Sequence, residues 1–107
     1  MTTPTTEKIG NLLEHNKIIV FMKRNKLMTQ FGFSKQVVQI LNILGVPYET
    51  VDVLADQDIR QGIKEYSNWP TIPQVYINGE FVGGSDVMNE LYQKGELQQM
   101  VEVALAS

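Results

Sequence analysis

The pattern of apolar and polar residues predicts a chain that alternates between helices and strands. Residues 18–22 form a short run of β-branched and apolar side chains, which is typical of a strand buried on both faces of a sheet. Residues 48–53 predict a second strand. Apolar residues that recur three and four positions apart predict amphipathic helices over residues 5–15, 37–44 and 56–66, and two further helices near the end of the chain.

A hairpin is predicted around Asn78 and Gly79, because this dipeptide separates two short apolar segments, 74–77 and 80–82. Asn-Gly suits the tight turn in which both central residues take positive φ angles. The predicted order of elements is therefore α-β-α-β-α-β-β-α-α. An early parallel β-α-β unit followed by a hairpin indicates an α/β fold with a four-stranded mixed sheet flanked by helices.

Length and composition predict one domain over residues 1–107. Hydrophobic residues make up 43% of the chain and charged residues 20%, and there is no internal repeat or linker. The polar N-terminus lacks the apolar core of a signal peptide, and no apolar run approaches the ~18 residues that a membrane span requires. These features predict a protein of the cytoplasm, or of an organelle matrix or stroma, that has no membrane partner.

Basic residues gather in one predicted loop. Lys23, Arg24, Lys26 and Lys35 are four of the nine basic residues, and no acidic residue lies between the first and the last of them. The rest of the chain carries five basic and twelve acidic residues, a net charge of −7. A basic loop on an acidic body favours a small anionic ligand over a nucleic acid, whose phosphates most of the surface would repel. A solvated lysine loop without a ligand is the alternative.

The chain has no cysteine, which excludes disulfides and thiolate metal sites. Its one histidine, His15, lies at the predicted end of a helix, where an exposed capping role is expected rather than catalysis. Ser34 has no general base near it in the sequence, and no zinc-ligand spacing or catalytic carboxylate pair is present. The residues therefore predict no metal site and argue against an enzyme.

Three motifs, taken in their order and spacing, carry a resemblance to a known family. They are Phe31-Gly32-Phe33-Ser34, Trp69-Pro70-Thr71-Ile72-Pro73-Gln74 and Gly83-Gly84-Ser85-Asp86. Together with Lys23 and Arg60 they resemble the monothiol glutaredoxins, with Phe31 in place of the cysteine of their Cys-Gly-Phe-Ser motif. The resemblance covers nearly the whole chain and implies a thioredoxin-like (glutaredoxin) fold.

The resemblance also implies a groove for glutathione or a similar small anionic peptide. Lys23 and Arg60 would bind its glycine carboxylate, and the backbone of Ile72 would pair with its cysteinyl unit. Ser85 and Asp86 would hold the γ-glutamyl end. For Arg60, packing of its aliphatic shaft is the alternative. The residues expected to shape the site are Gly32, Phe33, Ser34, Trp69, Pro70, Thr71, Pro73, Gly83 and Gly84.

More detailed expectations concern three of these positions. The resemblance implies a cis peptide bond before Pro73, which would turn the Ile72 backbone toward the groove. Ser85 is expected to cap a helix that begins at Asp86, leaving free amides that face an anion. Trp69 is expected to pack beneath the pocket as a core or rim residue.

The chain departs from the family pattern at four clustered positions, which are Arg24, Asn25, Thr29 and Phe31. The family usually has glycine where Arg24 stands and often has proline where Thr29 stands. Phe31 and Phe33 would lie close together at the mouth of the pocket. Two outcomes are weighed equally for Phe31: its ring forms a contact surface, or it fills the empty thiol site. The four residues fit natural divergence and engineering alike.

The leading interpretation is a cysteine-less glutaredoxin. It would keep a glutathione-type groove but perform no thiol redox chemistry, and no protein thiolate would ligate a [2Fe-2S] cluster. In the family, two subunits share such a cluster with two glutathiones, and BolA-like proteins are partners. Without a bridging cluster a monomer is expected. The alternative is a family-typical [2Fe-2S] carrier or redox protein, of which this chain is a mutant or diverged form.

Overall fold

The computed structural model describes residues 3–24 and 32–106, in which every predicted helix and strand is present in the predicted order. The elements are α1 (Pro4–His15), β1 (Ile18–Met22), α2 (Gly32–Leu44), β2 (Glu49–Asp52), α3 (Gln57–Ser67), β3 (Gln74–Ile77), β4 (Glu80–Gly83), α4 (Ser85–Gln93) and α5 (Glu96–Ala106). Helix α2 begins before the apolar stripe over 37–44 that predicted it. Its first turn therefore contains the Gly32-Phe33-Ser34 part of the first motif.

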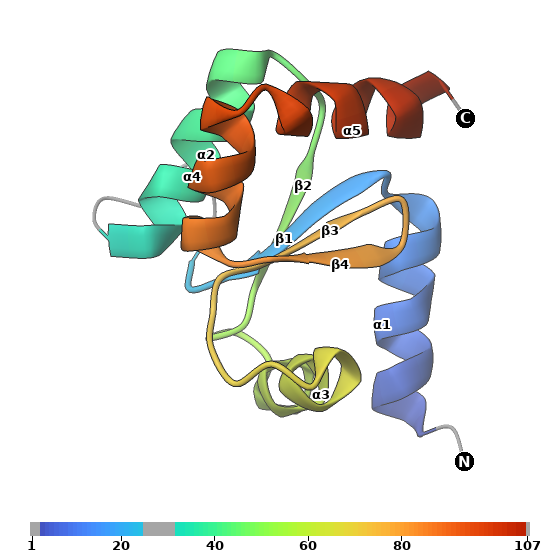
Figure 1. The fold of residues 1–107 in the computed structure, drawn as a ribbon. Helices are drawn as coiled ribbons and strands as arrows, with labels where there is room; N and C mark the ends of the chain where they lie inside the picture. The colour runs from blue at the N-terminus through green and yellow to red at the C-terminus, as the bar shows by residue number, and fades with distance from the viewer. Residues whose placement is uncertain (1–2, 25–31, 107) are drawn as a thin grey trace.

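The four strands form one mixed sheet in the order β2-β1-β3-β4. Strand β1 pairs in parallel with β2 and antiparallel with β3, and β3 pairs antiparallel with β4. Figure 1 shows α1 and α3 on one side of the sheet and α2, α4 and α5 on the other. The predicted four-stranded mixed sheet with helices on both faces is therefore confirmed.

Strand β1 is buried on both faces, and each of its five residues is at most 2% exposed. Alternate residues of a strand point to opposite faces of a sheet. Ile18, Val20 and Met22 accordingly pack against α2, α4 and α5, whereas Ile19 and Phe21 pack against α1 and α3. The central strand thus supplies side chains to two separate cores.

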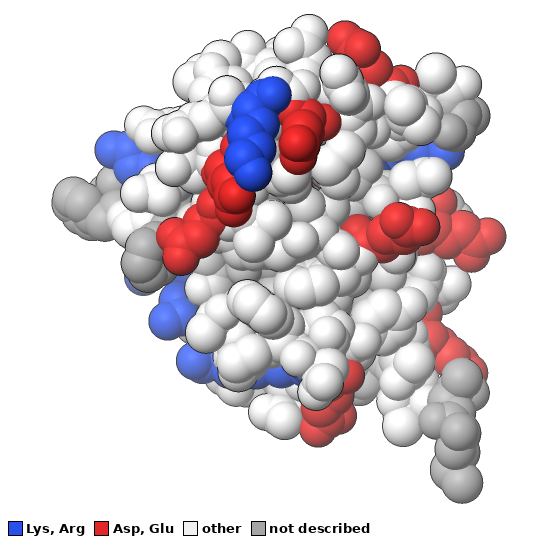
Figure 2. Space-filling view, in the orientation of Figure 1, with Lys and Arg blue, Asp and Glu red and all other residues white. Residues whose placement is uncertain are grey.

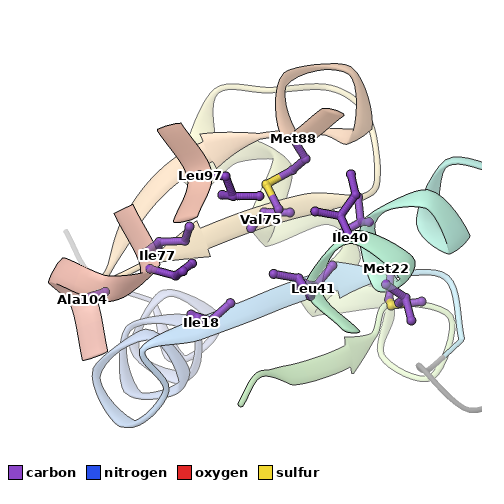
Figure 3. Packing of buried hydrophobic residues seen from close by; sticks show 13 residues of the cluster. Ile18, Met22, Ile40, Leu41, Val75, Ile77, Met88, Leu97 and Ala104 are labelled. Carbon is purple, nitrogen blue, oxygen red and sulfur yellow. The ribbon is translucent and has the colours of Figure 1, made fainter. Parts of the chain in front are cut away.

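The two cores differ in their helices and in their content. The α2–α4–α5 core is aliphatic, and Figure 3 shows side chains of these helices converging on the sheet face that carries Ile18, Val75 and Ile77. The α1–α3 core contains two aromatic rings and lies beneath the opposite face. Its buried residues are Ile9, Leu13, Ile19, Phe21, Val53, Ile59, Ile63 and Tyr76.

Helices α1 and α3 lie close together because a glycine faces a threonine between them. A Cβ atom built on Gly62 would lie 2.6 Å from Cγ2 of Thr5, so a larger residue would push the helices apart. Asp56 caps α3 by accepting a hydrogen bond of 3.1 Å from the Ile59 amide, and it also accepts one of 2.6 Å from Nζ of Lys8. The Lys8 bond, followed by the Ile59 amide, lowers the pKa of Asp56 below its usual value.

The predicted hairpin turn is confirmed. Asn78 and Gly79 have φ angles of 54° and 82°, the positive values that a two-residue turn of this kind requires. Val75 pairs with Gly83 and Tyr76 with Phe81, so β4 contains one extra residue opposite this step. Such a β-bulge bends the strand that carries it. The bend lies just before the Gly83-Gly84 pair.

The basic residues that the sequence places in one loop are exposed wherever the structure describes them. Lys23, Arg24 and Lys35 are exposed, and Lys26 lies outside the described residues. Figure 2 shows acidic side chains at several separate places on one face of the molecule. Over residues 3–24 and 32–106, no helix is both long and apolar enough to cross a bilayer.

Tyr76 is the largest side chain of the α1–α3 core and is 1% exposed. Its ring makes an edge contact with Phe21 at a centroid distance of 5.6 Å, and its hydroxyl donates a hydrogen bond of 3.2 Å to Oε1 of Gln74. Burial raises the pKa of Tyr76 to about 12. The folded chain therefore retains this proton at a pH where the unfolded chain has lost it.

We expect the alkaline stability of the protein to depend on Tyr76. Because the pKa is about 12 in the folded chain and near 10 in the unfolded chain, the Tyr76 contribution is complete below pH ~10 and is lost as the pH rises toward 12. The free energy of unfolding should fall by roughly 2 to 3 kcal/mol more in the wild-type chain than in Tyr76→Phe over this range. Urea unfolding at a series of pH values measures the difference, and parallel curves for the two proteins would contradict the assignment.

Candidate functional site

The loop before β3 contains the predicted cis peptide bond, between Ile72 and Pro73. Ile72 is half-buried, and its amide and carbonyl have no hydrogen-bond partner among the residues that the structure describes. Because Pro73 precedes the strand, these two backbone groups lie outside the sheet ladder. They are available to a peptide that lies beside the loop in an extended conformation.

Gln74 holds this loop and was not singled out from the sequence. It is fully buried at the first position of β3, and its Nε2 donates hydrogen bonds of 3.0 Å to the Trp69 carbonyl and 3.2 Å to the Thr71 carbonyl. The signal that could have found it is a polar residue that begins an otherwise apolar strand. A fully buried amide must form hydrogen bonds, and the nearest carbonyls are those of the loop.

Trp69 lies at the rim of the α1–α3 core. Its side chain is 40% exposed, and its ring contacts Phe81 at a centroid distance of 5.7 Å. The backbone of Trp69 is fixed by the end of α3, since its amide donates to the Lys64 carbonyl and to Oγ of Ser67, both at 3.1 Å. Trp69 is therefore a rim residue and not a fully buried core residue, and its packing beneath the pocket stays an expectation.

The glycine pair brings α4 against the cis-proline loop. A Cβ atom built on Gly84 would lie 3.2 Å from the Pro73 carbonyl oxygen, so the two backbones approach closely here. Gly83 has a φ angle of 150°, and a Cβ atom on it would lie 2.7 Å from Cβ of Val87. Only glycine can take the φ angle of Gly83 and lie this close to Val87 without strain.

The capping role expected for Ser85 is wrong. Helix α4 begins at Ser85 itself, its N-cap is Gly84, and no side chain caps it. A residue that already has helical backbone angles cannot direct its side chain back to the next amides as an N-cap does. Ser85 is buried and Asp86 is exposed in the first turn. The first amides of α4 are consequently left to an external acceptor, as expected for an anion site.

Lys23 follows the last residue of β1. Phe21 pairs with Gln74 at the end of the antiparallel ladder, so Lys23, just after β1, and Ile72, two residues before β3, both leave the sheet at the same end. Arg24 has a φ angle of 66°, which costs a non-glycine residue energy and accounts for the glycine usual in the family at this place. Oδ1 of Asp52 accepts hydrogen bonds from the amides of Arg24 at 2.8 Å and Leu54 at 2.9 Å. Besides Gln74, Asp52 is thus a second residue whose role in holding the site was not predicted from the sequence.

The remaining predicted site residues lie on helices α2 and α3 or outside the described part. Arg60 is half-buried on α3, next to the buried Ile59. Gly32 begins α2 with a φ angle of 82°, and Ser34 is half-buried in the same turn. Asn25, Thr29, Phe31 and the side chain of Phe33 lie outside the described residues. Both outcomes weighed for Phe31 thus stay expectations.

In the part of the chain that the structure describes, no group of His, Asp and Glu could hold a metal ion.

We expect alanine to have opposite effects at Gly83 and at Gly10 of α1. Gly83→Ala should destabilise the fold by about 1 to 3 kcal/mol, since it combines a positive φ angle with the contact to Val87. Gly10→Ala is the matched control. No atom lies within 4 Å of its added Cβ, and alanine in a helix should stabilise by about 0.5 to 1 kcal/mol. Urea unfolding measures both, and changes of the same sign would contradict the strain at Gly83.

Comparisons with known proteins agree with this arrangement. The glutaredoxin family model matches residues 18–82. The chain is 71% identical to an uncharacterized monothiol glutaredoxin, ycf64-like, of Synechocystis sp., over 107 residues that cover the whole of both chains.

Two solved structures extend the agreement to the fold. Reduced apo GrxS14 from poplar is 48% identical, with a TM-score of 0.85 over 94% of this chain and 93% of that chain. A buckwheat glutaredoxin–glutathione complex is 26% identical, with a TM-score of 0.82 over 94% and 89%. The predicted thioredoxin-like fold is confirmed. With these matches and no cysteine in its 107 residues, the chain belongs to the glutaredoxin family, as a cysteine-less relative of the monothiol glutaredoxins.

Proposed function

We propose that the protein is a thiol-free binding module that holds glutathione, or a similar small anionic peptide, in the groove between the cis-proline loop and the first turn of α4. The peptide would bind reversibly and would not be oxidised or reduced by the protein. The residues proposed to bind it are Lys23, Arg60, Ile72, Ser85 and Asp86.

The observation that carries this proposal is the close approach of Gly84 to Pro73. The distance of 3.2 Å from a Cβ on Gly84 to the Pro73 carbonyl oxygen is tighter than most Cβ contacts, so the backbones of the loop and of α4 approach closely there. A peptide can then form backbone hydrogen bonds with Ile72 while its charged end lies at a helix N-terminus. The glutathione in the related buckwheat glutaredoxin supports the choice of ligand.

One end of the proposed groove is formed by basic residues, and the other end by an acidic residue and a helix N-terminus. Lys23 is exposed at the end of the sheet from which the cis-proline loop also leaves, and would attract the glycine carboxylate, together with Arg60. At the other end, Asp86 would pair with the ammonium of the γ-glutamyl unit, and the uncapped amides of α4 would bind its carboxylate. Such contacts contribute about 1.5 to 3 kcal/mol each before ordering costs. We therefore expect affinity near the millimolar range.

Thiol chemistry and cluster ligation do not fit the residues of this chain. Glutaredoxin chemistry needs a thiolate nucleophile, and [2Fe-2S] clusters are held mainly by cysteine thiolates. The chain has no cysteine, and the oxygen of Ser34 is a poor substitute for a soft ligand. We propose that the protein lacks both activities. The alternative, a family-typical [2Fe-2S] carrier, would then describe a parent that has cysteine at position 31.

Two proposals about assembly follow from the family alone. A BolA-like protein remains the proposed protein partner, because the partner-facing surface would not need the thiol. Since a cluster bridges two subunits in the family, we propose that the chain without a bridging cluster is a monomer.

Glutathione added to the labelled protein should shift the NMR signals of Ile72, Ser85 and Asp86 with an affinity near the millimolar range. Lys23→Glu should weaken binding because it places a carboxylate where the peptide carboxylate is held. Lys17→Glu is the matched control: Lys17 is an equally exposed lysine just before β1, at the opposite end of the same strand. The Lys17→Glu variant should bind glutathione with an affinity within about twofold of the wild-type value.

Two outcomes of this titration would contradict the proposal. Equal weakening by Lys23→Glu and Lys17→Glu would show that only the net charge matters. The absence of any shift at about tens of millimolar, well above the expected range, would indicate that Phe31 blocks the groove.

Reconstitution with iron, sulfide and glutathione tests the proposed loss of cluster ligation. The Phe31→Cys variant should develop the charge-transfer bands of a thiolate-ligated cluster in its visible spectrum, whereas the wild-type chain should develop none, because only the variant supplies a soft protein ligand. Equal bands in both proteins would show that the cluster does not need a protein thiolate, and would refute the proposal.

A further inference from the structure

We propose that Gln74 is the positioning residue of the groove: its side-chain amide sets the shape of the Trp69–Ile72 segment, so that the Ile72 backbone faces the ligand. The part that concerns the ligand rests on the proposed function. The control of the loop by Gln74 does not depend on any ligand.

Two hydrogen bonds connect the Gln74 side chain to the loop. Nε2 donates to the carbonyls of Trp69, at 3.0 Å, and Thr71, at 3.2 Å. Both NH bonds of the amide are therefore used on a segment that lies three to five residues earlier in the chain. Thr71 directly precedes Ile72, so the bond to its carbonyl fixes the peptide unit that carries the Ile72 amide.

The Gln74 amide can satisfy its neighbours in only one orientation. Carbonyl oxygens accept but do not donate, so Nε2 must face Trp69 and Thr71. Oε1 then faces Tyr76, whose hydroxyl donates to it at 3.2 Å. Because Gln74 is fully buried, a flipped amide would leave polar groups without partners and would be costly. Tyr76 thus selects the orientation that holds the loop.

Gln74 also belongs to the buried centre of the sheet. It pairs with Phe21 of the central strand β1, which is buried on both faces. The loop itself has an exposed tryptophan and no ladder hydrogen bonds of its own before Gln74. The end of α3 fixes only the Trp69 amide of this segment, so the Gln74 side chain is what connects the segment's carbonyls to the sheet.

The test compares Gln74→Met with Ile77→Val. Methionine has a similar length and fits a buried site but cannot donate, so the two loop bonds are lost while the volume is retained. Ile77→Val removes one methylene from the same strand on the other sheet face and makes no contact with the loop bonds. The readouts are glutathione affinity by NMR and the fluorescence of Trp69, the single tryptophan of the chain.

We expect Gln74→Met to lose a factor of about 2 to 10 in glutathione affinity per lost loop bond and to change the Trp69 emission and its quenching by acrylamide. Ile77→Val should change neither. Equal effects of the two variants, or an unchanged affinity and emission in Gln74→Met, would overturn the proposal. If the wild-type chain itself does not bind glutathione, the proposed function fails, but a changed Trp69 emission in Gln74→Met alone still supports the control of the loop.

The Gln74→Glu variant adds a pH dependence of the Trp69 emission and of the glutathione affinity. A purely packing role of Gln74 would not produce this pH dependence. An ionised carboxylate cannot donate to the Trp69 and Thr71 carbonyls, whereas a protonated carboxyl can donate to one of them. Burial beside two carbonyls raises the pKa of the introduced carboxyl. Lowering the pH from about 8 to about 5.5 should therefore move its Trp69 emission and glutathione affinity toward the wild-type values.

The neighbouring titratable groups do not obscure this measurement. The titratable side chain that contacts the Gln74 amide is the Tyr76 phenol, whose pKa burial raises to about 12, so it keeps its proton throughout this pH range. The Tyr66 ring contacts the Tyr76 ring rather than the Gln74 amide. The wild-type chain and Gln74→Met should accordingly give flat profiles. A flat profile for Gln74→Glu, in a protein that stays folded by circular dichroism, would overturn the role of the donated hydrogen bonds. If Gln74→Met does not fold, this profile decides the proposal.

Discussion

The burial of β1 on both faces is the constraint on which the rest of the structure depends. A strand that is covered on both sides needs two layers of helices, and here α1 and α3 form one layer while α2, α4 and α5 form the other. The partners of β1 also determine where the site lies. β1 ends beside Asp52 of β2 and beside the start of β3, so Lys23 and the cis-proline loop both leave the sheet at the same end of its strands.

Most of the fold could be predicted because its signals are local. The apolar run at 18–22, the helical spacing of the amphipathic segments and the Asn78-Gly79 turn each depend on residues that are close in sequence. The predicted start of α2 was too late, although Phe33 lies four residues before Val37 and continues the helical spacing. The cis bond before Pro73 came from the family resemblance, because the flanking residues alone favour neither isomer strongly.

The supports of the site were less predictable than its proposed ligand-binding residues. Gln74 and Asp52 form hydrogen bonds with backbone groups of the Trp69 and Arg24 segments. Every residue has such backbone groups, so the sequence does not indicate which segment either side chain will bind. Ser85 was misassigned by a single position at a helix start, where the first helical residue and the N-cap have similar composition. The backbone of this site is thus held by residues other than those proposed to contact a ligand, so its shape does not depend on a thiol.

The two open edges of the sheet bear on how the protein can associate. The outer strands β2 and β4 have four residues each, and each begins with an exposed glutamate, Glu49 or Glu80. The bulge further distorts β4. Short, charged and irregular edges resist pairing with the strands of another molecule, because the incoming ladder would bury carboxylates and meet a broken register. Association by extension of the sheet is therefore disfavoured, and the loops and helices are the surfaces better suited to a contact.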